Sequence, residues 1–306
     1  MNTTDTHSKP VIEVEALSRR FDLKLALNDI HLTVPRGCVF GLVGENGAGK
    51  TTLIKHLLGL LKAQSGTVRV FGLDPVAAPV DVLGRLGYVS EQRDLPGWMR
   101  VDELLRYTAA FYPRWDHGYA EQLRREFVLE PDARIRNLSR GELAKAGLLV
   151  ALAHRPELLV LDEPSSGLDP VVRRDILEAI IRTVADEGRT VFFSSHLLDE
   201  VERVSDRLAM MVEGRVILSG RLEEIRANHH QLTLRFNAVP IVPPELPGVL
   251  RLTGAGQEWT VIANGARAEL VEAAGRLGAK VVAERSPSLD EIFVARASVK
   301  KSGAQN

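Results

Sequence analysis

The stretch "CVFGLVGENGAGKTTLIKHLLGLL", residues 38 to 61, decides the fold of this chain. It opens with a short, nearly all-apolar run, which is typical of a strand that is covered on both faces. A glycine-rich segment follows, and apolar residues from Leu53 to Leu61 then recur at the spacing of one helix face. Residues Gly44 to Thr51 match the G-x-x-x-x-G-K-[ST] pattern in full, in the strand–loop–helix context that the pattern requires. The stretch therefore predicts a phosphate-binding loop in an α/β sheet.

The residue types of this loop indicate a nucleoside triphosphate and Mg²⁺ as its ligands. The glycines let the backbone wrap around the phosphates, so that amide N–H groups from about Gly47 to Thr52 point inward. Lys50 is expected to neutralise the β- and γ-phosphate oxygens, and the Thr51 hydroxyl to bind Mg²⁺. The nucleotide-binding residues predicted for the loop are Gly44, Glu45, Asn46, Gly47, Ala48, Gly49, Lys50, Thr51 and Thr52.

Two other predicted strands end in polar side chains. The run "LLVLDE", residues 158–163, ends in two carboxylates, and ligands of open α/β sheets lie at the carboxyl ends of the strands. We predict that Asp162 holds Mg²⁺ through water and that Glu163 polarises the attacking water. His196 follows the run "TVFFSS" and is predicted to orient that water near the γ-phosphate.

Two more side chains are predicted to contact the nucleotide or its metal ion. Gln92 follows the strand pattern "LGYVSE", and an amide oxygen can bind a metal ion and release it at little cost. We therefore assign Gln92 to catalysis and to Mg²⁺ binding. Phe21 follows the first predicted strand and is expected to stack on adenine, with a core aromatic as the alternative interpretation.

A second helix start that suits an anion lies about ninety residues after the first. In "NLSRGE", residues 137–142, small polar residues and a glycine precede a helical pattern. The N–H groups and the dipole of such a helix start attract phosphate. Because the phosphate loop already surrounds one side of a γ-phosphate, we predict that Ser139 and Gly141 cover the nucleotide of a second copy packed head to tail.

The rest of the chain predicts an α/β domain followed by a small α+β appendage. Alternating runs before residue 38 indicate an antiparallel N-terminal β subdomain, and the later buried runs a mixed parallel core sheet. The fold class expected is therefore a P-loop NTPase with a helical insert. The predicted segments are a disordered start at 1–10, a nucleotide-binding domain at 11–226 with the helical insert at about 101–140, an accessory domain at 231–297 and a disordered tail at 298–306.

The bulk composition argues against several classes of function. The chain has 306 residues and a formal net charge of −1, so its overall charge gives no reason to expect nucleic-acid binding. Its single cysteine, Cys38, excludes an internal disulfide and fits a reducing cytoplasm. No stretch approaches the roughly 18 apolar residues that cross a bilayer. Any work at a membrane is therefore expected to need a partner.

The order of these motifs resembles that of the ATP-binding subunits of ABC transporters, over roughly residues 11–225. The signature of that family usually reads Leu-Ser-Gly-Gly-Gln, whereas Arg140 and Glu142 replace the first glycine and the glutamine here. Ser139 and Gly141 remain, so we expect activity to survive. The matching segments are "GENGAGKTT", similar to the Walker A motif; Gln92, to the Q-loop; "LSRGE", to the signature; "LLVLDE", to Walker B; "SSGLD", to the D-loop; His196, to the switch histidine; and Phe21, to the adenine-stacking aromatic.

The resemblance implies an ATPase that powers a membrane transporter. ATP would join two such domains, and hydrolysis would let them separate and drive the partner between two states. The expected partners are a polytopic membrane subunit and a second ATPase, identical or paralogous, with no nucleic acid. The expected location is cytoplasmic, on the inner face of the cell membrane through the membrane subunit.

The resemblance also implies where the partner docks and in which direction cargo moves. The helical insert and the ending "SPSLDEIF" resemble those of bacterial drug and peptide exporters, so an exporter is expected. Asp169 would contact the opposite subunit or cap the helix that begins at Pro170. The apolar residues expected to meet the membrane subunit are Pro96, Trp98, Met99 and Trp115.

Three other interpretations stay open at this point. A soluble ABC-type ATPase could act on the ribosome or on DNA, but the fused second cassette or long coiled coil of such proteins is absent from the sequence. A GTPase should carry an Asn-Lys-x-Asp stretch, which is also absent, and a kinase would not need "LSRGE". The appendage could bind a ligand or a second copy and serve regulation, which is compatible with transport. The sequence does not identify the cargo.

Overall fold

The computed structural model describes residues 9–185, 188–240 and 242–303. The chain divides into two compact units, Met1–Ser219 and Gly220–Asn306. The boundary precedes residue 226, where the sequence predicted the first domain to end. Most of the predicted disordered start lies outside the described residues, as does the end of the predicted tail.

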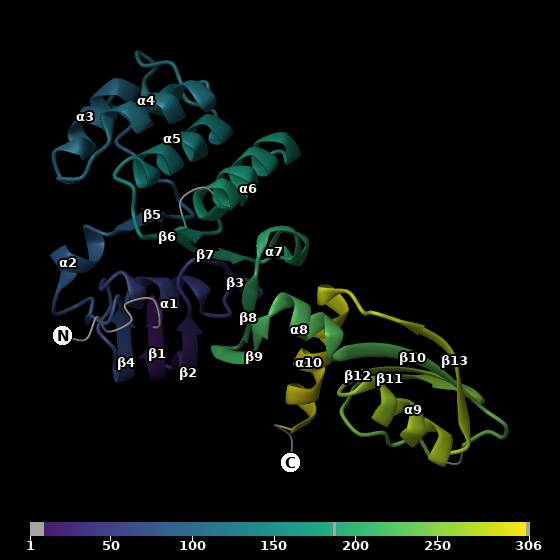
Figure 1. The fold of residues 1–306 in the computed structure, drawn as a ribbon. Helices are drawn as coiled ribbons and strands as arrows, with labels where there is room; N and C mark the ends of the chain where they lie inside the picture. Colours follow the sequence, from purple (N-terminus) through teal and green to yellow (C-terminus); the bar gives the residue numbers. More distant parts are fainter. Residues whose placement is uncertain (1–8, 186–187, 241, 304–306) are drawn as a thin grey trace, which may run out of the picture. The chain divides into compact units, whose positions relative to one another are not determined.

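A mainly parallel sheet forms the centre of the first unit (Figure 1). Every residue of β3, β6 and β7 is buried, as expected for strands covered on both faces. β5, β6, β7, β3 and β8 pair in parallel, and β9 joins the edge after a turn at Glu213 and Gly214, both with positive φ. The predicted mixed parallel core sheet is therefore confirmed. Among the described residues its order is β5 (Leu86–Val89), β6 (Leu158–Asp162), β7 (Thr190–Ser195), β3 (Val39–Val43), β8 (Arg207–Val212) and β9 (Arg215–Arg221).

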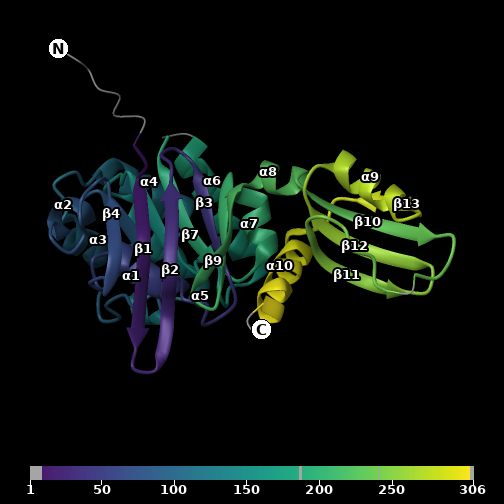
Figure 2. The same ribbon diagram turned by 90° about the horizontal axis from the view of Figure 1, so that it is seen from below.

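A separate antiparallel sheet forms the predicted N-terminal β subdomain (Figure 2). It consists of β2 (Lys24–Val34), β1 (Ile12–Phe21) and β4 (Ser65–Val70), in that order. The inward residues of β1 and β2, such as Leu17 and Leu27, are fully buried, while most of the other residues of the two strands are half-buried or exposed. The hairpin that joins these two strands pairs Phe21 with Lys24 and so places both side chains at one end of the subdomain.

Helices follow the strands of the first unit, and those of the insert gather away from the antiparallel sheet (Figure 1). α4 begins at Asp116, whose carboxylate accepts a hydrogen bond from the Tyr119 N–H at 2.9 Å. The predicted helical insert contains α3, α4 and the short 3₁₀ turn η1, and it ends at the start of α5. The helices of this unit are α1 (Lys50–Leu57), α2 (Pro79–Leu83), α3 (Val101–Ala109), α4 (His117–Glu126), η1 (Ile135–Asn137), α5 (Arg140–Leu152), α6 (Pro170–Ala185) and α7 (Leu198–Val204).

The second unit has an antiparallel sheet of its own with α9 packed on it (Figure 1). Leu232, Leu234 and Val261 of the sheet and Leu270 and Ala274 of α9 form its buried core. The strand order is β11-β12-β10-β13, an arrangement that agrees with the α+β pattern of the sequence. Its elements are α8 (Leu222–Ala227), β10 (His229–Phe236), β11 (Val249–Ala255), β12 (Glu258–Asn264), α9 (Arg267–Arg276), β13 (Ala279–Arg285) and α10 (Leu289–Gly303).

The last helix is longer than the sequence predicted. Ser288 and Glu291 form the expected reciprocal capping hydrogen bonds, at 2.9 and 3.3 Å. The helix then continues to Gly303, so the prediction of disorder is wrong for residues 298–303. Neither proline nor glycine interrupts the segment before Gly303, and the Ser298 hydroxyl donates to the Val294 carbonyl oxygen of the preceding turn.

Candidate functional site

A cavity of about 310 Å³ lies over the carboxyl end of β3 and the start of α1. It has a polar wall, as a phosphate ligand requires, and it brings together residues from four separate parts of the first unit. Lys24, Ala26 and Glu91 line it as well, and the sequence analysis named none of these three. The predicted residues that line it are Phe21, Asn46, Gly47, Gly49, Lys50, Thr51, Thr52 and Glu163.

The loop before α1 can be built only with glycines at its tight positions. Gly49 has a φ of 108°, and a Cβ atom there would lie 2.6 Å from the Ala26 carbonyl oxygen. A Cβ atom on Gly44 would lie 2.6 Å from the Met211 carbonyl oxygen. Gly49 is also the N-cap of α1 and has no side chain to cap it. The first N–H groups of α1 therefore remain available to an anion at the cavity.

Lys50 is buried at the bottom of this loop and is held by oxygens. Its Nζ atom donates to the carbonyl oxygens of Gly44, at 2.5 Å, and Glu45, at 3.3 Å. The same atom lies 2.9 Å from Oε1 of Glu163, and both side chains are about 95 % buried. The two side chains form an ion pair, and Oε1 of Glu163 is not aligned to accept a hydrogen bond. The positive charge expected to meet phosphate is thus balanced by a carboxylate of the protein.

Glu163 and His196 are in direct polar contact. Nδ1 of His196 lies 2.7 Å from Oε2 of Glu163. Because an ionised carboxylate only accepts, this contact places a proton on Nδ1 and leaves Nε2 of a neutral ring as an acceptor. Glu163 has a φ of 48°, a costly backbone conformation for a residue other than glycine.

A buried serine bonds the Asp162 carboxylate and the backbone of Glu163. The Ser194 hydroxyl donates to Oδ1 of Asp162 at 2.7 Å and accepts from the Glu163 N–H at 3.0 Å. It therefore joins the ends of β6 and β7 and holds the strained backbone of Glu163. Asp162 is only 1 % exposed and is not among the lining residues of the cavity, so its contact with a metal ion through water stays a prediction.

Gln92 does not line the cavity, and the residue before it does. After β5 ends at Val89, the chain turns: the Arg93 N–H donates to the Ser90 carbonyl oxygen at 3.2 Å and to its hydroxyl at 3.1 Å. This turn directs Glu91 to the cavity wall and leaves Gln92 exposed. The role of Gln92 in catalysis and metal binding stays a prediction, and Glu91 is a further residue at the cavity wall. A carboxylate oxygen is also a ligand that Mg²⁺ accepts.

Ser139 and Gly141 lie outside the cavity of their own chain. Ser139 is the N-cap of α5: its hydroxyl accepts from the Glu142 N–H at 3.2 Å, and the Glu142 carboxylate accepts from the Ser139 N–H at 2.8 Å. These hydrogen bonds from Ser139 lower the pKa of Glu142. The exposed Ser139 and Arg140 leave this helix start open to solvent, and Gly141 packs against Val172.

Phe21 is available to a ligand rather than buried in the core. Its side chain is 41 % exposed and lines the cavity, which contradicts the alternative interpretation as a core aromatic. The Arg19 guanidinium carbon lies 4.7 Å from the ring centroid. Lys24 pairs with Phe21 across the hairpin, and its Nζ atom approaches Gly47 of the phosphate loop. A lysine three residues after the predicted stacking aromatic was the signal that could have identified it.

Arg93 is a further residue that the sequence did not reveal. Its Nη2 atom donates to the carbonyl oxygens of Pro164, at 3.1 Å, and Ser166, at 2.7 Å. Burial lowers the pKa of its guanidinium. Arg93 therefore connects the loop that carries Glu91 to the segment that follows Glu163. Asp169 at the end of that segment caps α6, since its carboxylate accepts from the N–H groups of Val171 and Val172.

The oxygen donors around the cavity fit Mg²⁺ bound together with a phosphate. Thr51 and Glu91 line the cavity and supply hydroxyl and carboxylate oxygens, which are hard ligands. Among the described residues no group of three or more His, Cys, Asp or Glu side chains could hold a metal ion by itself. Mg²⁺ usually keeps several waters and takes one or two protein ligands beside phosphate oxygens, so a larger cluster is not required.

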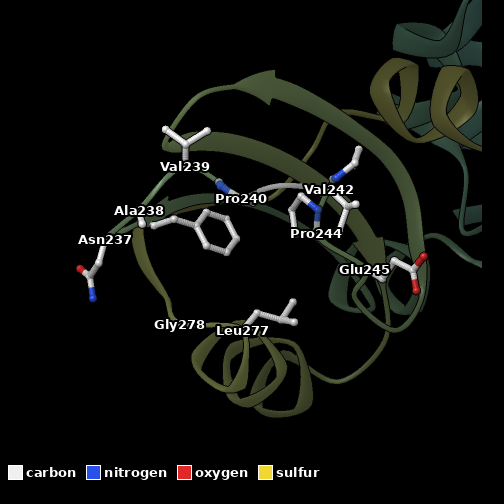
Figure 3. A pocket seen from close by; sticks show the side chains of 11 residues that line it. Asn237, Ala238, Val239, Pro240, Val242, Pro244, Glu245, Leu277 and Gly278 are labelled. Atoms are coloured by element: carbon white, nitrogen blue, oxygen red, sulfur yellow. The ribbon is translucent and has the colours of Figure 1, made fainter.

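The second unit contains a hollow of a different kind, of about 630 Å³ (Figure 3). Leu277, at the end of α9, faces the proline-rich loop that carries Val242 and Pro244. Glu245 is the one charged side chain among its described lining residues, and no phosphate-binding loop borders it. The smaller polar cavity of the first unit is therefore the candidate site for nucleotide chemistry, despite its lower volume.

No helix in the described part of the chain is both long enough and apolar enough to span a bilayer.

Comparison with a family model gives a match over residues 27–166, to the family described as ABC transporter. The ABC transporter ATP-binding protein YtrB of Bacillus subtilis is 28 % identical over 94 % of this chain and 98 % of its own length. NatA, an ABC transporter ATP-binding protein of the same organism, is 32 % identical over 74 % of this chain and 96 % of its own. The bacitracin transport ATP-binding protein BcrA of Enterococcus faecalis is 32 % identical over 73 % of each chain.

Solved structures give the same result for the first unit. One described as an ATP-binding subunit of an ABC transporter is 31 % identical, with a TM-score of 0.65 over 71 % of this chain and 92 % of its own. CbiO1 from Clostridium perfringens is 26 % identical, with a TM-score of 0.62 over 71 % and 91 % of the two chains. The predicted P-loop NTPase fold is confirmed by these similarities.

Proposed function

Because this chain belongs to the ATP-binding subunits of ABC transporters, we propose that it hydrolyses ATP with Mg²⁺ to power a membrane-embedded transport subunit. The observation that carries this proposal is the contact of Glu163 with both Lys50 and His196 under the phosphate loop. A carboxylate in hydrogen-bond contact with an imidazole, beside a lysine suited to phosphate, is the arrangement that hydrolysis by an activated water needs.

The ion pair between Lys50 and Glu163 suggests how binding prepares the reaction. When phosphate oxygens enter the loop, Lys50 can exchange its contact with Glu163 for them. This exchange releases Oε1 of Glu163 to accept a proton from water, while His196 keeps Oε2 in place at 2.7 Å. Nε2 of His196 is then an acceptor that can orient the same water. Bound Mg²⁺ would neutralise phosphate charge, with Thr51, Gln92 and Asp162 as the residues that would hold it. Glu91 at the cavity wall is a further candidate.

We also propose that two copies, or one copy and a paralogue, work head to tail. The exposed helix start at Ser139 and Arg140 supports this proposal, because it offers N–H groups to an anion and lies outside its own chain's cavity. The two phosphate-facing helix starts of one chain would then serve two different nucleotides. Asp169 would contribute to the same contact in addition to capping α6.

The membrane partner and the direction of transport are further parts of the proposal. Several large apolar side chains on and before the insert are exposed, including Trp98, Tyr107 and Phe111. Met99, by contrast, is 5 % exposed and belongs to the core of the insert, so it is removed from the set of candidate contacts. CbiO1 is described as part of an ABC transporter complex and BcrA as a bacitracin transport protein. These relatives support a membrane subunit as the partner. We infer that this chain lies on the inner face of the cell membrane through that subunit and that the direction of transport is export.

The test is the Glu163→Gln variant. We expect it to bind ATP and to lose at least 100-fold in turnover, because an amide cannot accept the proton of the water. With ATP and Mg²⁺ it should elute from a size-exclusion column as a nucleotide-loaded dimer. The matched control is Glu157→Gln, the same change at the other end of β6, where Glu157 pairs with Arg85. This control should turn over ATP like the wild type.

A Glu163→Gln protein that stays monomeric with ATP and hydrolyses it at the wild-type rate would refute the assignment. The partner is tested separately, by purifying the tagged chain from detergent-extracted membranes of its own cells. Recovery of a polytopic membrane protein supports the transporter, and recovery of ribosomes or DNA in its place contradicts it.

A further inference from the structure

A buried carboxylate that is outside the proposed reaction lies close to the contact between Glu163 and His196. Glu200 on α7 is 1 % exposed. Burying an ionised carboxylate is costly unless hydrogen bonds and an opposite charge compensate it. Such a residue therefore needs partners, and the identity of its partners indicates what it does.

The partners of Glu200 come from three separate segments. The Ser165 hydroxyl donates to Oε2 at 2.5 Å, and the Ser195 hydroxyl donates to the same oxygen at 3.1 Å. Nε of Arg173, on α6, lies 3.2 Å from Oε1 in an ion pair that is not aligned for a hydrogen bond. Ser165 follows Glu163 by two residues, and Ser195 directly precedes His196.

The ion pair with Arg173 alone would be sufficient to fasten α6 to α7. The two hydroxyl contacts are different, because each comes from a segment that carries one partner of the Glu163–His196 contact. Both serines are fully buried, at 1 % and 0 % exposure, so water does not replace Glu200 as their acceptor. Oε2 of Glu200 thus joins the two backbone segments whose separation sets the 2.7 Å distance between Glu163 and His196.

We propose that Glu200 is a positioning residue that fixes the Glu163 carboxylate against the His196 imidazole through the hydroxyls of Ser165 and Ser195. This inference rests on the proposed ATPase function, because it assigns a role in that same site. Misplacement of a reacting group by about 1 Å can cost on the order of 100-fold in rate. Loss of one of two anchoring hydroxyls should give a smaller defect, with the nucleotide-binding loop left intact.

The main experiment measures steady-state ATP hydrolysis by Ser165→Ala. We expect kcat to fall about 10-fold and KM for ATP to stay within about twofold, because the variant keeps the phosphate loop. The matched control is Ser205→Ala, which also removes a buried serine hydroxyl, at the end of α7. Among the described residues the Ser205 hydroxyl has no hydrogen-bond partner, so kcat should not change.

A double-mutant cycle separates positioning from packing. Glu200→Gln keeps the shape of the side chain and should also lower kcat by about 10-fold. Adding Ser165→Ala to it should cost less than about threefold more, because both changes break the same connection. Ser165→Thr, which keeps the hydroxyl, should recover most of the activity. Ser195→Ala gives an independent test if Ser165→Ala does not fold.

Two results would overturn the inference. Wild-type kcat in both Ser165→Ala and Glu200→Gln would show that the connection does not position the reacting groups. Additive losses in the double variant, with no recovery by Ser165→Thr, would show that each residue acts only through packing. Glu163→Gln in the same assay distinguishes failure of the proposed function from failure of this inference. If it abolishes turnover while Ser165→Ala is as fast as the wild type, the proposed function stands and only this inference fails. A wild-type chain without ATPase activity would contradict both.

Discussion

His154 should make the first unit less stable as the solution becomes mildly acidic. The residue follows α5, is 2 % exposed, and its ring stacks on Tyr112 with centroids 3.9 Å apart. Its Nε2 atom lies 3.2 Å from the carbonyl oxygen of Leu86, which is the first residue of β5. Burial, the largest cause, lowers the pKa of His154 from 6.5 to about 4, against the opposing effect of this hydrogen bond.

The sign and the size of the effect follow from this pKa. Between pH 6.5 and about 4 the unfolded chain binds a proton at His154 that the folded chain does not bind, so the free energy of unfolding falls as pH falls. At 1.36 kcal/mol per pKa unit the complete loss is about 3 kcal/mol, and it is reached near pH 4. From pH 7 to pH 5.5 the loss is about 1 kcal/mol.

The assay compares urea unfolding of the wild type and His154→Gln at pH 7 and pH 5.5, at constant ionic strength. Glutamine can still donate to the Leu86 carbonyl oxygen but does not titrate. Trp259 is replaced by phenylalanine in both proteins, so that fluorescence reports Trp98 and Trp115 of the first unit. The wild type should lose about 1 kcal/mol more than His154→Gln over this interval. Equal losses in the two proteins would refute the assignment of a low pKa to His154.

Two further predictions concern the nucleotide. Lys50→Ala should weaken ATP binding by at least about 30-fold, or roughly 2 kcal/mol, because it removes the phosphate partner and the lysine charge beside the buried Glu163 carboxylate. Unchanged affinity in a fluorescence titration would contradict the phosphate-loop assignment. Phe21→Ala should weaken ATP about 10-fold by loss of base stacking, while inorganic tripolyphosphate binds as before, and an equal loss for both ligands would exclude stacking.

The parts of the site that depend on local backbone were predictable from the sequence. The phosphate loop follows from glycines that no other residue can replace, as the close approach of Gly49 to Ala26 shows. Asp162, Glu163 and His196 follow buried strands directly, and parallel strands bring their carboxyl ends to one edge of a sheet. The strand pattern of the sequence was therefore enough to predict where these side chains lie.

The residues that were missed or misassigned depend on turns and on packing between distant segments. The turn after β5 brings Glu91 to the cavity wall, and no periodicity in the sequence reveals that turn. Lys24 is brought to the cavity by the register of a hairpin. The last helix continues past residue 298, where neither proline nor glycine interrupts the chain before Gly303.

By itself, the sequence determined the order of the strands and helices, the phosphate loop and the identity of the groups at the strand ends. Only the tertiary structure decided the partners of the buried charges. Lys50 forms an ion pair with Glu163, and the Glu200 carboxylate accepts hydrogen bonds from two serines. The physical reason is that backbone geometry is set by neighbours in the chain. The partner of a buried charge, in contrast, is set by where segments more than thirty residues apart meet in space.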